Sequence, residues 1–374
     1  MKTRGAVLNA MGVEPPYDRT KPLAIDEVEL REPGRGEVLV RIAAAGLCHS
    51  DLSVINGDRP RPTPMLLGHE AAGIVEKLGE GVDSLAKGDH VVLVFVPSCG
   101  HCIPCAEGRP ALCTAGAGSN TAGTLLGGQR RIFRGDQAIN HHMGCSAFAQ
   151  YAVVARNSLV KVDPELPLEE AALFGCAVLT GVGAVVNTAK VPMGATVAIV
   201  GLGGVGLAAL LGAVASGASR IVAVDLAADK REFARTLGAT DAFDAGVPNA
   251  IDAIRDATQG GVDFALEFAG SVKAMDLAYR VTRRGGTTVT AGLPPPNATF
   301  ALPQTHLVAE ERTVKGSYIG TCVPARDLPR YVALYRQGKL PVDKLLTHRL
   351  KLDDINAGFE RLRVGQAIRQ VVVF

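Results

Sequence analysis

The sequence predicts an α/β protein with two domains, one of them built on a doubly wound parallel sheet. The chain has 374 residues, more than a single hydrophobic core usually holds. Its first 160 residues read as short apolar runs separated by Gly, Pro and Asp clusters, which is typical of β-structure. From Ala195 onward, apolar runs alternate with helical segments, and this alternation indicates a parallel sheet covered by helices.

Composition and charge narrow the classes of partner. Hydrophobic residues make up 47% of the chain, charged residues 20%, and the formal net charge is +2, so neither a nucleic acid nor an anionic membrane is expected as a partner. The N-terminus lacks the apolar run of a secretory signal, so we expect a cytoplasmic protein with reduced thiols. The uncharged stretch Val191–Ser219 contains seven glycines and one proline, which favours strand, turn and helix over a membrane span.

Four β-strands are expected in the first part of the chain, followed by an alanine-rich, helix-compatible stretch over Leu168–Ala189. The expected strands are Glu37–Ala45, Ala72–Leu78, His90–Val96 and Phe148–Ala155. No long helical period appears among them, so this part should be mostly β.

Strands and helices alternate in the second part. The expected strands are Ala195–Val200, Arg220–Asp225, Val262–Gly270 and Gly285–Leu293. The helices expected between the first three are Leu207–Ala218 and Leu226–Ala239, and a further helix precedes the fourth. Two amphipathic helices, near Leu328–Gln337 and Asp353–Arg363, and a strand over Ile368–Phe374 complete the chain.

A glycine-rich loop, GLGGVG at residues 201–206, lies between an expected strand and an expected helix. In this pattern Gly201 permits a tight turn, Gly203 lets backbone N–H groups approach a pyrophosphate, and Gly206 lets the helix pack on the strand. Gly204 and Val205 open the helix, whose N-terminus presents free N–H donors to phosphates. The loop is therefore a candidate dinucleotide-binding site.

Asp225 strengthens that interpretation. It ends the next expected strand, nineteen residues after Gly206. Its carboxylate can accept hydrogen bonds from the hydroxyls of the adenine ribose and would repel a 2′-phosphate. The sequence therefore favours NAD over NADP.

Four of the eight cysteines fall within fifteen residues, at Cys99, Cys102, Cys105 and Cys113. Disulfides would need an oxidising compartment, and a redox pair normally needs one C-x-x-C near a βαβ unit. This spacing in a cytosolic chain instead indicates a tetrahedral zinc ion. Because all four positions are protein ligands, the ion is expected to be structural; His101 is read as solvent-facing.

Three further residues form a second candidate set: Cys48 in GLCHSD, His69 in GHE and Cys176 in LFGC. Each alone could be an ordinary buried or turn residue. Together they supply two sulfurs and one nitrogen, which is the pattern of a catalytic zinc with a position open to water or substrate.

These residues resemble the zinc-dependent medium-chain alcohol dehydrogenases, most closely their long-loop, dimeric plant and animal type. The shared motifs, in the family's order, are GLCHSDL, LLGHEAAGIVEKLGEGV, CGHCIPCAEGRPALC, LFGC, GLGGVG, IVAVD and IRQVVVF. The resemblance implies a GroES-like catalytic domain over residues 1–177 with a zinc loop at 99–113. It also implies an inserted Rossmann domain over 178–320, a return to the catalytic domain over 321–374, and a homodimer.

The resemblance also implies roles around the catalytic zinc. Asp51 corresponds to the carboxylate that orients His69, and Glu70 to the one behind the metal. Ser50 corresponds to the hydroxyl that takes the substrate's proton. Phe95 matches an aromatic residue of the alcohol pocket, and Leu293 is expected near the same pocket.

Four more positions match cofactor contacts of the family. Thr180 is similar to a residue beneath the nicotinamide, and Lys230 to one beside the adenosine. His49 and Arg369 match positions that contact the pyrophosphate.

The sequence departs from its relatives at informative places. Ser53 stands where some relatives carry the histidine that passes the proton to water. TAGAG follows Cys113, where the glutathione-dependent formaldehyde dehydrogenases have an arginine. Cys176 stands where sugar and polyol relatives often have glutamate. Cys145 and Cys322 have no assigned role and are expected to be buried thiols.

The function expected from these features is reversible oxidation of a primary or secondary alcohol, with NAD and two zinc ions per chain. Two alternatives stay open. One is glutathione-dependent formaldehyde dehydrogenase activity, and the other is a catalytically silent NAD-binding sensor.

Overall fold

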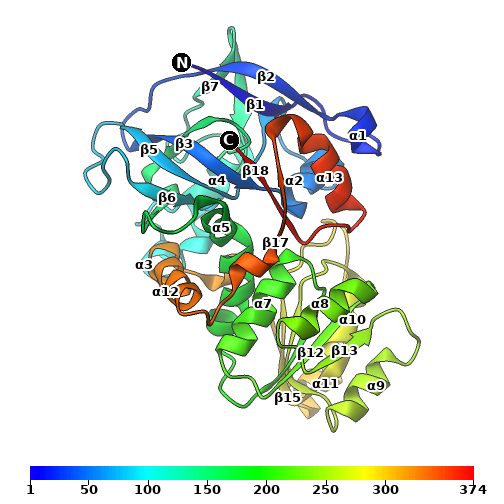
Figure 1. Cartoon of the computed structure of the whole chain (residues 1–374). Helices are drawn as coiled ribbons and strands as arrows, with labels where there is room; N and C mark the ends of the chain where they lie inside the picture. The colour runs from blue at the N-terminus through cyan, green and yellow to red at the C-terminus, as the bar shows by residue number, and fades with distance from the viewer. The chain divides into compact units, whose positions relative to one another are not determined.

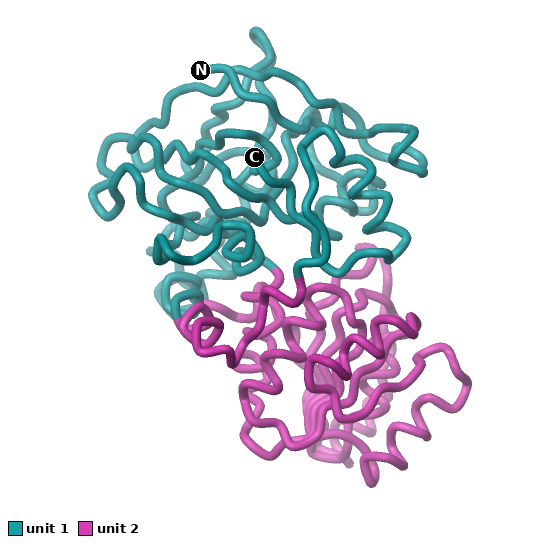
Figure 2. Tube along the Cα trace, viewed as in Figure 1, with its two compact units in different colours: residues 1–176, 323–329, 346–374 teal, residues 177–322, 330–345 magenta.

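The computed structural model describes residues 1–374 and divides into two compact units (Figures 1 and 2). Unit 1 comprises residues 1–176, 323–329 and 346–374, and unit 2 comprises 177–322 and 330–345. Residues 330–345 therefore belong to unit 2, whereas the sequence placed them in the catalytic domain. One contact that holds them there is the Asn187 amide, which donates to the hydroxyl of Tyr331 at 3.3 Å.

Unit 1 contains a closed barrel of five strands in the order β1-β2-β7-β8-β4. Their bounds are β1 Lys2–Leu8, β2 Leu23–Leu30, β7 Ile132–Arg134, β8 Gln137–His141 and β4 Met65–Leu66. The barrel forms because apolar residues such as Val7, Leu30 and Ile139 point into one buried cluster. None of these five strands was expected from the sequence.

A second sheet of unit 1 has the order β10-β6-β5-β3-β18-β17, with β9 also pairing with β3. The bounds are β10 Leu159–Val162, β6 His90–Leu93, β5 Ala71–Leu78, β3 Glu37–Gly46, β18 Arg369–Val373, β17 Leu346–Leu350 and β9 Tyr151–Ala155. All four expected strands are present. However, β6 ends three residues before Val96, and β9 begins three residues after Phe148. Because β18 pairs antiparallel with β3, the carboxyl-terminal segment completes the sheet formed by the first part of the chain.

Short helices connect the strands of unit 1. They are α1 Tyr17–Thr20, α2 His49–Ile55, α3 Ile103–Ala106, α4 Thr114–Ala122, α5 Leu168–Leu173 and α13 Ile355–Arg363. Helix α12, Pro324–Arg336, begins in unit 1 and ends in unit 2.

The alanine-rich stretch Leu168–Ala189 is helical, as expected. It runs from α5 through a π-helical turn, Phe174–Val178, and α6, Leu179–Gly183, to a second π-helical segment, Ala184–Ala189. The stretch is long and apolar enough to cross a membrane, but 83% of its most apolar window is buried inside the protein. Such burial is what a core helix shows.

Unit 2 is built on a parallel sheet with the order β13-β12-β11-β14-β15-β16. The strands are β11 Thr196–Val200, β12 Arg220–Asp225, β13 Asp241–Asp244, β14 Val262–Glu267, β15 Thr282–Thr290 and β16 Thr313–Gly316. The helices are α7 Gly204–Ala215, α8 Ala228–Thr236, α9 Ala250–Ala257, α10 Val272–Val281 and α11 Gln304–Ala309. Numbered along the chain, the strand order is 3-2-1-4-5-6, the Rossmann order for dinucleotide-binding folds. The predicted fold class is confirmed.

Candidate active site

The fold of unit 1 brings Cys48, His69 and Cys176 together. Cys48 follows β3 and caps the N-terminus of α2, His69 lies three residues after β4, and Cys176 sits in the π-helical turn after α5. All three are buried, and their ligand atoms lie within 4.8 Å of one another. Residues that are 21 and 107 positions apart in sequence thus form one cluster.

The cluster fits a zinc ion. Ligands about 2.3 Å (sulfur) and 2.0 Å (nitrogen) from a tetrahedral zinc lie about 3.5 Å from each other. The Sγ of Cys176 and the Nε2 of His69 are 3.5 Å apart. The thiol of Cys176 and the ring of His69 also lower the pKa of Cys48 well below its usual range, which favours the thiolate that a metal requires.

Asp51 orients the imidazole of His69. Its carboxylate is fully buried on α2, and its Oδ2 lies 3.1 Å from the Nδ1 of His69, at ion-pair distance rather than in an aligned hydrogen bond. The backbone N–H of Gly68 donates to the Oδ1 of Asp51 at 3.1 Å. With Nδ1 facing the carboxylate, Nε2 faces the sulfurs, the arrangement found around histidine ligands of zinc.

Glu70 and Arg369 form a buried ion pair next to this cluster. Burial raises the pKa of Glu70 to about 7, although Arg369 opposes the increase. The Oε1 of Glu70 has no hydrogen-bond partner. Because Arg369 is itself buried on β18 and committed to Glu70, its contact with a pyrophosphate stays a prediction.

The first turn of α2 carries the other residues expected to handle protons and phosphates. Ser50 is half-buried and His49 is exposed. The hydroxyl of Ser53 donates to the backbone carbonyl of His49 at 2.9 Å. The hydroxyl hydrogen of Ser53 is therefore bonded within its own helix, and Ser53 does not replace the missing histidine as a proton acceptor.

Two aromatic rings flank His69 edge-on. The ring centroid of Phe95 is 5.3 Å from that of His69, and the centroid of His142 is 5.5 Å away. Phe95 therefore lies beside the candidate metal site, as its proposed role in the pocket requires. His142 was not expected at the site from the sequence. The signal that could have found it is a pair of adjacent histidines, His141 and His142, in a chain that has only eight.

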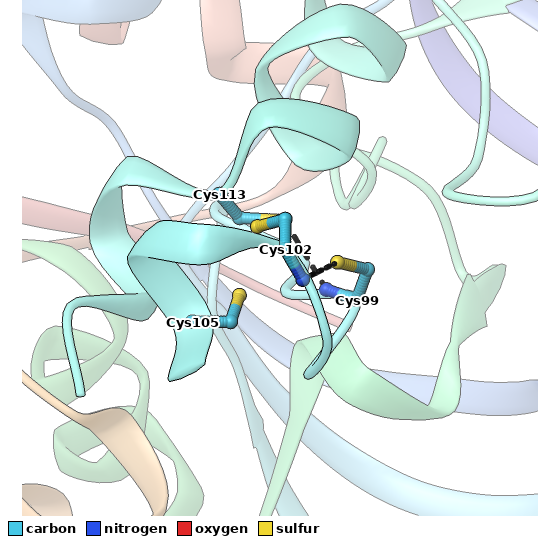
Figure 3. Close-up of side chains that lie close together, drawn as sticks. All are labelled: Cys99, Cys102, Cys105 and Cys113. Atoms are coloured by element: carbon cyan, nitrogen blue, oxygen red, sulfur yellow. Dashed lines mark hydrogen bonds between the residues drawn. The ribbon is translucent and has the colours of Figure 1, made fainter. Parts of the chain in front are cut away.

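The four cysteines of the second set converge within one loop (Figure 3). All four sulfurs lie within 4.8 Å of one another, and those of Cys102 and Cys113 are 3.8 Å apart. Two sulfurs on a tetrahedral zinc would be about 3.8 Å apart. Backbone N–H groups of Cys105 and Thr114 help lower the pKa of Cys102 to about 6. The chain contains no disulfide.

The cysteine loop is connected through helix α4 to Phe95, the aromatic residue beside His69. The Sγ of Cys113 accepts from the N–H of Gly116 at 3.3 Å and so caps helix α4. Near the other end of α4, the buried amide of Asn120 donates to the backbone carbonyl of Phe95 at 2.9 Å. His101 is exposed and lies outside the sulfur cluster, as expected.

The glycine-rich loop of unit 2 has the form expected for pyrophosphate binding. Gly201 has a φ of +91°, in the left-handed region. A Cβ on Gly206 would lie 1.8 Å from the carbonyl oxygen of Gly201, so only glycine fits there. A Cβ on Gly203 would have no neighbour within 4 Å, which leaves open space at the N-terminus of α7.

Asp225 lies at the end of β12, where the sequence predicted it. Its Oδ2 accepts from the N–H of Leu202 at 2.6 Å, and its Oδ1 accepts from the N–H of Ala227 at 2.9 Å. These bonds fix the carboxylate next to the glycine-rich loop.

The remaining predicted residues of unit 2 are Thr180 on α6, Lys230 on α8, both half-buried, and Leu293, which is 54% exposed. Nothing tests their predicted contacts with a cofactor or substrate. Cys145 and Cys322 are fully buried thiols that form no disulfide, as expected.

The chain is similar to known proteins over its whole length. Residues 34–164 match the family model described as alcohol dehydrogenase GroES-like domain, and residues 204–337 match that of zinc-binding dehydrogenase. A putative alcohol dehydrogenase D of Mycobacterium tuberculosis is 41% identical over 100% of both chains. A probable S-(hydroxymethyl)glutathione dehydrogenase of Schizosaccharomyces pombe is 40% identical over 94% of each.

Solved structures agree. The crystal structure of benzyl alcohol dehydrogenase from Acinetobacter calcoaceticus superposes with a TM-score of 0.93 at 34% identity, covering 100% of this chain and 99% of that one. With both family models, full-length relatives and this structural match in agreement, the chain belongs to the zinc-dependent medium-chain alcohol dehydrogenase family.

Proposed function

We propose that the protein is a zinc- and NAD-dependent oxidoreductase that interconverts a primary or secondary alcohol and its aldehyde or ketone by hydride transfer. One observation carries the proposal: a buried set of two cysteines and one histidine leaves a ligand position open, in a chain that also holds a dinucleotide fingerprint. Relatives named as alcohol dehydrogenases support small alcohols and aldehydes as the substrate class.

Cys48, His69 and Cys176 would hold the catalytic zinc. When bound there, zinc supplies Lewis-acid chemistry that makes the proton of an alcohol easier to remove. Asp51 keeps the ring of His69 oriented through Nδ1, and the burial of all three ligands excludes bulk water from them. Ser50, half-buried two residues after Cys48, is the hydroxyl that would accept a hydrogen bond from the alcohol and, as the proton crosses, release its own proton toward solvent.

The cofactor proposed is NAD rather than NADP. Both carboxylate oxygens of Asp225 are anchored by backbone N–H groups, and each keeps a lone pair to accept a hydrogen bond from a ribose hydroxyl. A 2′-phosphate at that position would meet the carboxylate's negative charge. Gly203 leaves the space into which a pyrophosphate can approach the start of α7.

The second zinc is proposed to be structural. Cys99, Cys102, Cys105 and Cys113 would fill all four positions around it, so no substrate could bind this metal. Its role is to hold together a loop with three half-buried cysteines and no apolar core of its own.

A homodimer in the cytoplasm remains our proposal for assembly and location. The outer strand of the unit 2 sheet, β16, has an unpaired edge in the single chain and could pair with a second copy. The balanced net charge of +2 supports small molecules, not nucleic acids or membranes, as partners.

Glutathione-dependent oxidation of formaldehyde is the second candidate, because the relative from S. pombe carries that name. The segment after Cys113, from Thr114 to Gly118, forms the start of α4 and offers no arginine for a glutathione carboxylate.

Metal analysis and a substrate panel test these proposals together. We expect two zinc ions per chain and reduction of NAD, followed by absorbance, with short aliphatic, benzylic or allylic alcohols. Turnover only with formaldehyde plus glutathione would favour the second candidate. One zinc per chain and no turnover with any substrate would instead identify a nucleotide-binding sensor and contradict the proposed function.

A further inference from the structure

We propose that His142 is a positioning residue for the catalytic metal site: it holds the carboxylate of Asp51, which in turn orients His69. This inference rests on the proposed function, because it assumes that His69 is a zinc ligand. His142 lies outside the motifs that the chain shares with the family.

The topology of the barrel places His142 at the site. Strands β4 and β8 pair in parallel, with Leu66 opposite His141. Because parallel strands leave the sheet at the same edge, the residues that follow them emerge side by side. Those residues are Leu67–His69 after β4 and His142 after β8.

The carboxylate of Asp51 is shared by two imidazoles. Its Oδ2 lies 3.1 Å from the Nδ1 of His69, and its Oδ1 lies 3.2 Å from the Nδ1 of His142. All three side chains are buried. The N–H of Gly68 also donates to Oδ1, so His142 is the side-chain contact at an oxygen that the backbone already holds, and the two together fix the carboxylate plane that faces His69.

His142 is anchored well enough to serve this purpose. Its backbone N–H donates to the hydroxyl of Ser146 at 2.9 Å, and its carbonyl accepts from the N–H groups of Cys145 and Ser146. The tight turn that these bonds close has left-handed residues at Met143, Gly144 and Ser146. The turn therefore fixes the backbone position from which the His142 side chain extends.

The Nδ1 of His142 lies at ion-pair distance from the Oδ1 of Asp51 rather than in an aligned hydrogen bond, and neither nitrogen of this buried ring has a hydrogen-bond partner. A carboxylate only accepts hydrogen bonds, so the proton of the His142 ring belongs on Nδ1. A side chain with a donor at that position should preserve the function, and one of equal bulk without a donor should not. This distinguishes positioning from packing.

Two variants separate those roles. His142→Asn places an amide donor close to the position of Nδ1, and His142→Phe keeps a ring but removes the donor. We expect His142→Phe to lose the catalytic metal about 10- to 100-fold faster to a chelator such as EDTA, the usual effect of removing such an outer contact. His142→Asn should stay within about threefold of the parent, since it keeps the donor.

Metal retention is measured on the full-length protein, and the metal of the Cys99–Cys113 loop serves as the internal control, because His142 does not touch it. Replacing the catalytic zinc with cobalt gives a second readout. The visible spectrum of the cobalt site should change in His142→Phe and match the parent in His142→Asn.

A double-mutant cycle tests whether His142 acts through Asp51. In an Asp51→Asn background, His142→Phe should cause no further loss of metal. Equal loss from the Asn and Phe variants, an unchanged His142→Phe, or additive effects in the cycle would each overturn the inference. A parent that holds zinc only in the cysteine loop would instead overturn the proposed function, so the two failures are distinguishable.

Discussion

The chain carries two sulfur-rich sites that are built in different ways. Cys99, Cys102, Cys105 and Cys113 come from one loop of fifteen residues near the surface, and backbone N–H groups of the same loop support their sulfurs. Cys48, His69 and Cys176 come from three separate elements and are buried.

The difference concerns what each site needs from the rest of the protein. The loop needs only its own residues, so a metal there can stabilise a local structure. The buried site needs β3, β4 and α5 in place before its ligands meet, so the fold must supply the geometry in advance. A closed set of four ligands suits a structural role, and an open set of three suits catalysis.

The largest expected effect comes from removing a ligand of the buried site. Cys176→Ala should lower turnover at least about a thousandfold, because Lewis-acid activation contributes several kcal/mol and each 1.36 kcal/mol is a factor of ten. The variant should stay folded and retain one zinc per chain, as measured by steady-state kinetics, circular dichroism and metal analysis. Cys145→Ala, which removes a buried thiol outside both clusters, is the control. Parent-like turnover in Cys176→Ala would show that the buried set is not the catalytic site.

Removing a ligand of the loop should act on stability first. Cys102→Ala should lower the free energy of unfolding by more than about 3 kcal/mol, since loss of a metal belongs to the most destabilising class of substitution. Urea unfolding followed by circular dichroism measures this change, and soluble yield should fall with it. If the variant is as stable as the parent, the loop does not hold a structural metal and the comparison between the sites breaks down.

A smaller effect on catalysis is expected from a change at the proposed cofactor site, which lies outside both cysteine clusters. Asp225→Ala removes charged acceptors for the ribose hydroxyls, each worth about 1.5–3 kcal/mol, so the KM for NAD should rise about tenfold or more. The preference for NAD over NADP should weaken at the same time. Kinetics with both cofactors measure the change, and an unaltered preference would remove Asp225 from its proposed role.

The smallest effect concerns the pH dependence of stability. Burial, aided by Arg130 and Arg131, lowers the pKa of His141 to about 3, whereas an unfolded histidine titrates near 6.5. The unfolded chain therefore binds more protons below pH 6.5, and stability is lost as the pH falls toward 3. His141→Gln should make the protein about 1 kcal/mol less sensitive to a change from pH 6.5 to 5.5.

Unfolding by urea at several pH values measures this difference. The matched control is His101→Gln, which makes the same substitution at an exposed histidine. Identical slopes for the parent and His141→Gln would contradict the assignment.

The sequence predicted those features that depend on local spacing. The four-cysteine loop, the GLGGVG turn and Asp225 each lie where their spacing required, because a short segment determines its own geometry. Strand β13 and helix α9 were not predicted. Residues Asp241–Asp244 have two apolar residues between two aspartates at the outer position of the sheet, and this short half-buried segment gives little hydrophobic signal.

His142 could not be found from local sequence for a different reason. Its importance comes from the parallel pairing of β4 with β8, two strands about 70 residues apart, of which β4 has only two residues. Neither strand was predicted. Contacts that depend on the register between distant short strands are fixed by tertiary structure.

Helix α4 connects the two candidate metal sites. It begins at the sulfur of Cys113 and, about 10 Å farther along its axis, the amide of Asn120 donates to the backbone carbonyl of Phe95 beside His69. One helix thus joins the four-cysteine loop to Phe95, the residue proposed to line the substrate pocket. If the outer loop holds a metal, losing that metal should therefore shift the backbone of Phe95 and alter alcohol preference without any contact between that metal and the substrate.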